Sequence, residues 1–149
     1  MPIGDDIQQK EFRDSHQKAM INLMYTSTWL NERMRVFLAP TDLTPQQFNV
    51  LRILRGAQPE PLSTLQIRER MIDKMSDTSR IVDRLVKKGF VEKSTCKQDK
   101  RLVDIFISQQ GLNLLKTMDE QELQFPSHLS ALSPEEAEHL SFLLDKIRD

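Results

Sequence analysis

Basic side chains gather in the middle of the 149-residue sequence. Residues 45–101 hold thirteen Lys and Arg against seven Asp and Glu, a net charge of +6, whereas the rest of the chain carries −7 and the whole chain −1. Guanidinium and ammonium groups clustered in this way suit phosphate binding, and a basic centre between acidic ends is the charge pattern expected of a nucleic-acid-binding face. A charged surface that only meets solvent would have the same composition.

Part of this basic centre is predicted to be a helix over residues 76–88, capped by Ser76 and ended by Gly89. A helix fits the DNA major groove, and its first turn supplies the side chains that reach base edges. Hydroxyl groups and guanidinium groups there can contact bases or phosphates. The residues of this helix expected to contact DNA are Ser76, Thr78, Ser79, Arg80 and Arg84. The alternative is that they only cap the helix, face water or pair with nearby carboxylates.

A polar, cationic turn follows, between two predicted strands at residues 90–95 and 102–107, the second of which alternates apolar and polar positions. An arginine held at the tip of a β-ribbon suits the narrow minor groove, where the negative potential is enhanced. Asp99 could hold Arg101 or the turn backbone in place; otherwise it only shapes the turn. The expected DNA contacts in this turn are Lys97, Asp99, Lys100 and Arg101.

The elements around this segment repeat one pattern of helix starts. Thr44 with Pro45 begins a helix that ends at Gly56, and Ser63 with Gln66 begins a short helix that runs to about residue 71. Two short helices joined by a tight turn, followed by a β-ribbon, form a winged helix-turn-helix. Residues 44–108 are therefore the expected DNA-binding region.

Longer helices are predicted at both ends of the chain. No Gly or Pro interrupts residues 5–38, and apolar residues recur there at helical spacing, so one long helix is expected to run from about Asp5 to Leu38. Such a helix is too long to be covered by a small domain, so its apolar stripe is expected to meet a second copy of the chain. Two further helices follow within residues 109–149, and a capping box of Ser133 and Glu136 is predicted to begin the second one. The expected fold is mostly α, an α+β winged helix-turn-helix with six helices and a two-stranded wing, and residues 5–38 and 109–149 form its dimerisation region.

Taken together and in order, these motifs resemble those of bacterial regulators of the multiple-antibiotic-resistance (MarR) type. The matching residues are Leu43, Thr44, Gln47, Phe48, Leu51 and Leu54, the run over residues 79–91, and Asp99, Arg101, Ile105, Ile107, Ser108 and Gly111. The resemblance implies a homodimeric transcription regulator, typically a repressor, in which two winged helices bind a pseudo-palindromic operator in double-stranded DNA. It also implies that a small lipophilic or phenolic effector binds between the dimerisation helices and the DNA-binding region and weakens DNA binding.

The first helix contains the candidate effector-pocket residues Tyr25, Trp29 and Arg33. The alternative for Tyr25 and Trp29 is a place in the dimer core, with Arg33 on the surface. One position departs from the family pattern, because Arg68 stands where a small residue is usual. Either its helix is spaced differently, or Arg68 reaches outward to a phosphate or an acidic partner.

Several other functions are excluded or kept as alternatives. The sequence has no Gly-rich phosphate loop, catalytic triad or metal-ligand spacing, so no enzyme, cofactor or metal site is expected. The single cysteine, Cys96, lies near lysines that could lower its pKa, so a redox switch there is one alternative, and a winged helix that binds proteins instead of DNA is another. The polar, acidic N-terminus and the absence of a long apolar run predict a cytoplasmic protein without a membrane segment.

Overall fold

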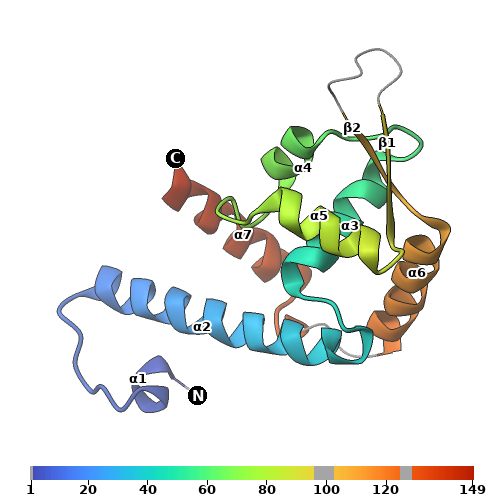
Figure 1. Ribbon diagram of the computed structural model, residues 1–149. Helices are drawn as coiled ribbons and strands as arrows, with labels where there is room; N and C mark the ends of the chain where they lie inside the picture. Colours follow the sequence, from blue (N-terminus) through green and yellow to red (C-terminus); the bar gives the residue numbers. More distant parts are fainter. Residues whose placement is uncertain (1, 96–102, 125–128) are drawn as a thin grey trace. The chain divides into compact units, whose positions relative to one another are not determined.

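The computed structural model describes residues 2–95, 103–124 and 129–149. All six predicted helices and the two-stranded wing are present, and two short helices, α1 and η1, were not predicted. In chain order the elements are α1 (Ile3–Asp6), α2 (Ser15–Leu38), η1 (Ala39–Thr41), α3 (Pro45–Ala57), α4 (Thr64–Arg70), α5 (Thr78–Lys87), β1 (Val91–Thr95), β2 (Val103–Ile107), α6 (Gln109–Gln124) and α7 (Pro134–Arg148) (Figure 1). The predicted fold class is confirmed.

The chain forms two compact units, residues 1–45 and 46–149. In the first unit the long helix begins at Ser15, so the prediction that it starts near Asp5 was wrong. Asp14 has extended backbone and accepts a 2.7 Å hydrogen bond from the N–H of Gln17, which makes it the N-cap of α2. Before it, Gln8 adopts a left-handed φ of 54° that no helix accommodates.

Helix α2 leaves most of its apolar side chains exposed. Leu38, at its last position, is its one buried residue. Its exposed large hydrophobic residues are Met20, Leu23, Met24, Tyr25, Trp29 and Val36. None of the residues of α7 is buried either, and its exposed hydrophobic residues are Leu140, Phe142, Leu143 and Ile147.

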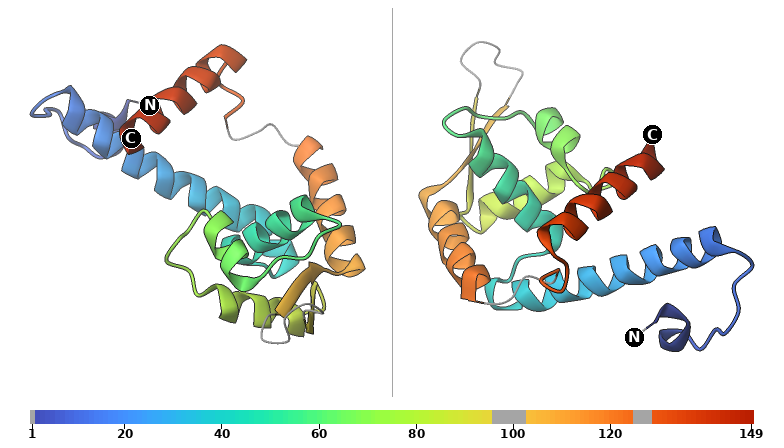
Figure 2. Two further views of the ribbon diagram at one scale, coloured as in Figure 1. Left: turned by 90° about the horizontal axis from the view of Figure 1, so that it is seen from above. Right: turned by 180° about the vertical axis from the view of Figure 1, so that it is seen from behind.

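The second unit has a hydrophobic core to which α3, α4, α5, the β-ribbon and α6 all contribute. Helices α3, α4 and α5 gather beside the ribbon in all views (Figure 2). Periodicity predicts which side each helix buries, since the inward residues recur at three- and four-residue intervals. The core residues of these elements are Val50, Leu51, Leu54, Ile67, Val82, Leu85, Val91, Ile105, Leu115 and Met118.

Two predicted capping boxes are confirmed. Ser63 begins α4: its hydroxyl accepts from the N–H of Gln66, and the Gln66 side chain accepts from the N–H of Ser63. Ser133 and Glu136 make the same exchange at the start of α7. Each box satisfies two N–H groups that a helix start leaves without partners. These helices therefore begin where the sequence predicts.

The wing is an antiparallel pair in which Val91 lies opposite Ile107 and Thr95 opposite Val103. Ile105 in β2 is also bonded on its other edge to Leu62, by N–H···O distances of 3.1 and 3.0 Å. The residue that precedes α4's cap is thus paired with the base of the wing. This pairing was not predicted, because Leu62 stands alone between Pro61 and Ser63, with no alternation to indicate a strand.

Within the described residues, no helix combines the length and the apolar character that crossing a lipid bilayer requires.

Candidate nucleic-acid interface

The turn between α4 and α5 sets the start of α5. The carboxylate of Asp73 accepts a 3.0 Å hydrogen bond from the N–H of Met75. The nearby Ser76 side chain and this N–H lower the pKa of Asp73, and the N–H of Ser76 donates a 3.3 Å hydrogen bond to the Asp73 carbonyl, which closes the turn. Ser76 therefore belongs to the turn, half-buried, and is not the helix cap.

Asp77 is the N-cap of α5, which corrects the prediction that Ser76 caps this helix. Its Oδ1 accepts a 3.1 Å hydrogen bond from the N–H of Arg80. The helix is consequently shifted by one residue relative to the prediction, and Thr78 is its first residue. Asp and Ser are both strong N-caps, so adjacent candidates could not be ranked from sequence alone.

The two faces of α5 differ in exposure. Thr78 retains 4% of its accessible surface, and Val82 and Leu85 are fully buried. Ser79 and Arg80 are exposed, and Arg84, one turn further on, is exposed as well. The structure thus brings these three predicted contact residues to the surface and places Thr78 inside.

Helix α5 is fastened to the wing on two sides. Lys93 in β1 donates to the carboxylate of Asp83 in α5. This hydrogen bond and the positive charge of Lys93 lower the pKa of Asp83. At the other end of the helix, Gly89 has a φ of 80°, which only glycine adopts without strain, and its carbonyl accepts a hydrogen bond from Ser108. The tip residues Cys96, Lys97, Asp99, Lys100 and Arg101 lie outside the described residues.

Comparison with known proteins agrees with this geometry. The model of the MarR family matches residues 43–103, from the cap region of α3 to the second strand of the wing. A helix-turn-helix-type transcriptional regulator from Bacillus cereus is 31% identical over 119 residues, which is 78% of this chain and 78% of the relative. The chain belongs to the MarR family. It is accordingly a DNA-binding transcription regulator and not an enzyme, as predicted.

Solved structures of MarR proteins share this fold. A mutant MarR from E. coli in complex with operator DNA has a TM-score of 0.71 and 26% identity, covering 85% of this chain and 91% of that one. BpsR from Bordetella bronchiseptica, whose DNA binding is regulated by 6-hydroxynicotinic acid, has a TM-score of 0.74 and 23% identity, covering 94% of this chain and 99% of that one.

The three residues suggested for a MarR effector pocket share one side of α2, since they follow at four-residue intervals. The guanidinium carbon of Arg33 lies 5.3 Å from the centroid of the Trp29 ring, within the range of a cation–π contact. Tyr25 and Trp29 retain 42% and 38% of their accessible surface. A cationic aromatic surface of this kind is chemically suited to an aromatic anion.

Thr64 was not among the predicted DNA contacts, and Arg68 was predicted to contact a phosphate only as one of two alternatives. Thr64 and Arg68 of α4 line a cleft together with Leu65 and with the residues that begin α5. For Arg68 the sequence held a signal, since it replaces the small residue usual in the MarR family. For Thr64 no signal was present, because it directly follows Ser63, and the hydroxyl of Ser63 alone accounts for the helix cap at this point. Among the described residues, no group of three or more His, Cys, Asp or Glu could hold a metal ion.

Proposed function

We propose that this MarR regulator is a homodimer that binds a pseudo-palindromic operator with its two winged helices and represses transcription until a small aromatic effector releases it. The observation that carries the proposal is the exposed face of α5. Arg80 and Arg84 lie on it beside Ser79, while Val82 and Leu85 of the same helix are buried. A helix with this distribution presents its cations to a partner, and double-stranded DNA is the partner whose major groove accepts a helix.

Contacts by the wing tip are part of the proposal. Lys97, Asp99, Lys100 and Arg101 connect the two strands, and Arg101 is assigned to the adjacent minor groove. Support comes from the pairing of β1 and β2, which extends to Thr95 and Val103, the residues that flank this segment in the sequence. The paired part of the ribbon is joined to α5 by the ion pair of Lys93 with Asp83.

Dimerisation is proposed through residues 5–38 and 109–149, with residues 44–108 as the DNA-binding region. Helices α2 and α7 both expose large apolar side chains along their length. Large apolar side chains exposed in this number on one helix are typical of an interface and cost free energy when left in water. Twofold symmetry of the dimer would then match a pseudo-palindromic operator.

The proposed effector site is the side of α2 that carries Tyr25, Trp29 and Arg33. A phenolic or other lipophilic anion would stack on the aromatic rings and pair with the guanidinium. The regulation of BpsR by 6-hydroxynicotinic acid, an aromatic acid, supports this class of ligand. Trp29 is the only tryptophan of the chain, so its fluorescence would report such binding directly.

The deciding experiment is selection of bound sequences from random DNA, followed by footprinting of the selected site. Two protected half-sites about one helical turn apart are expected. Repeating the footprint with a panel of phenolic acids, while recording Trp29 emission, tests effector release. Failure to bind DNA even at low salt, or an affinity that does not change with salt, would favour a protein-binding winged helix instead.

A further inference from the structure

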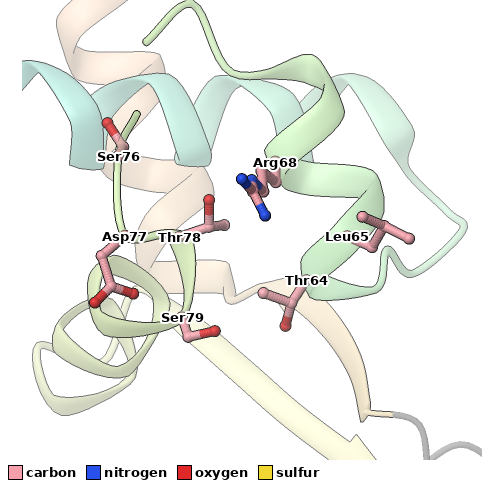
Figure 3. A pocket seen from close by; sticks show the side chains of 7 residues that line it. All are labelled: Thr64, Leu65, Arg68, Ser76, Asp77, Thr78 and Ser79. Carbon is pink, nitrogen blue, oxygen red and sulfur yellow. The ribbon is translucent and has the colours of Figure 1, made fainter. Parts of the chain in front are cut away.

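A cleft of about 430 Å³ lies between α4 and the first turn of α5 (Figure 3). Polar side chains predominate in its lining, unlike that of an apolar ligand pocket. Its residues are Thr64, Leu65, Arg68, Ser76, Asp77, Thr78 and Ser79. The cleft is open on one side, so a group attached to a larger molecule could enter it.

Two members of this lining are unusual, because the buried hydroxyls of Ser76 and Thr78 have no hydrogen-bond partner among the described residues. Thr78 is the more deeply buried of the two residues, with 4% of its surface exposed. A buried hydroxyl without a partner costs free energy, and such groups are rare in folded proteins. A buried hydroxyl without a partner in the wall of an open cleft indicates that its partner is supplied by a bound molecule.

The charge of the cleft indicates which kind of partner. The guanidinium of Arg68 extends from α4 into the cleft toward Thr78 (Figure 3). Thr78 and Ser79 are the first two residues of α5, so their N–H groups lie at the helix start, which is a favourable place for an anion. Asp77 is the one carboxylate of the lining, and its Oδ1 is engaged by the N–H of Arg80. In Figure 3 Asp77 lies on the side of Thr78 away from Arg68.

We infer that the cleft binds a phosphate group of the DNA backbone, held by the guanidinium of Arg68, the hydroxyl of Thr78 and the N–H groups at the start of α5. This inference rests on the proposed function, in which α5 enters the major groove. A backbone phosphate borders that groove and lies beside the helix start when the first turn reaches the bases. The contact fixes the position of α5 on the duplex without reading sequence.

The first test compares two arginines of α4. Arg70 is exposed and does not line the cleft, so R70Q is the matched control for R68Q. For R68Q we expect about tenfold weaker operator binding, because a charge-assisted contact is lost. The slope of log K against log salt should also flatten by about 0.9 per protomer, since each protomer loses its contact with one DNA phosphate. Equal affinity and equal slope for the two variants would overturn the inference.

The second test separates an effect on phosphate binding from an effect on the stability of the protein. T78V keeps the shape of the side chain but removes the hydroxyl, and T78S keeps the hydroxyl. Because the hydroxyl lacks a partner in the free protein, T78V should not lower the melting temperature, yet it should weaken operator binding several-fold. T78S should bind as the wild type does. Unchanged affinity in T78V would contradict a role for Thr78 in ligation.

A third test identifies the source of the phosphate. Operators with single neutral methylphosphonate linkages should reveal one position per half-site where binding weakens in the wild type but not in R68Q. The alternative source is free anion, probed with inorganic phosphate and NMR of the Thr78 and Ser79 amides. Phosphate binding that is lost in R68Q, combined with no sensitive linkage, would overturn the DNA source. If the wild type bound no DNA at all, the proposed function itself would fail, which is a different result.

Discussion

The hydroxyl of Ser108 donates a 2.6 Å hydrogen bond to the carbonyl of Gly89, the residue that ends α5. The same hydroxyl accepts from the N–H of Gly111 at 3.1 Å and so also caps α6. One buried side chain therefore joins the end of α5 to the start of α6. We expect S108A to lower the free energy of unfolding by about 1–3 kcal/mol, since it leaves the buried N–H of Gly111 and the carbonyl of Gly89 without this partner. Urea denaturation measures this, and S108T, which keeps the hydroxyl, is the comparison that should retain most of the stability.

The backbone beside this contact leaves no room for a side chain at Gly111. A Cβ there would lie 2.5 Å from the carbonyl oxygen of Phe90 and 2.8 Å from Cγ1 of Ile107. We expect G111A to destabilise the protein by about 1–3 kcal/mol or more, because backbone must move. Gly56 in α3 is the matched control, since a Cβ there meets nothing within 4 Å. G56A should be neutral or stabilising by about 0.5–1 kcal/mol. Equal thermal stabilities of the two variants would refute the close approach at Gly111.

The ion pair between Asp83 and Lys93 gives a pH-dependent prediction. The pKa of Asp83 is lowered in the folded protein, so its contribution is present above the unfolded-state pKa of about 3.9 and is lost as the pH falls through the folded-state value. D83N should therefore be slightly less stable than the wild type at pH 6, and the difference should shrink below about pH 4. The effect is small because both side chains are partly exposed. Melting temperatures measured from pH 3 to pH 7 would test it, and a difference independent of pH would contradict it.

Sequence reasoning was most successful where the signal was local. The boxes at Ser63 and Ser133 involve side chains three residues apart, so the short sequence contains the whole interaction. It failed where two local signals competed, as at Ser76 and Asp77, and where polar residues with fair helix propensity precede Asp14. It also could not find the cleft, because Arg68 and Thr78 come together only when α4 packs against α5. Exposure of Ser79, Arg80 and Arg84 was predictable, since the periodicity of the apolar residues sets the opposite face.

The proposed DNA contacts predict separate losses from helix and wing. R84A removes a cation from the exposed face of α5, and R101A removes the proposed minor-groove contact. Each should weaken operator binding by about 1–3 kcal/mol at matched salt. R70A serves as the control for loss of one charge. Fluorescence anisotropy with labelled operator provides the affinities, and an R101A variant that binds like the wild type would eliminate the proposed role of the wing tip.

The proposed dimer predicts that a charge on the apolar surface of α2 dissociates it. Met24 retains 65% of its accessible surface, so M24E should fold as well as the wild type does. Within a dimer interface, however, the unpaired carboxylate would be desolvated, and we expect the dissociation constant to rise at least about tenfold. N31E, at another exposed position of the same helix, controls for the added charge. Sedimentation over a range of concentrations should show monomer for M24E alone; equal masses for all three proteins would exclude this surface from the interface.

The pairing of Leu62 with Ile105 has a consequence for how an operator would be discriminated. It joins the residue before the cap of α4 to β2, while Lys93 in the middle of β1 and Ser108, just after β2, are each bonded to α5 or to the residue that ends it. Helix-turn-helix and wing are thereby parts of one rigid frame. A dimer built from two such units could change the distance between the units, but not the arrangement of helix-turn-helix and wing within either one. Spacer length between half-sites, rather than their base sequence, is then the operator property to which effector-controlled affinity should respond most steeply.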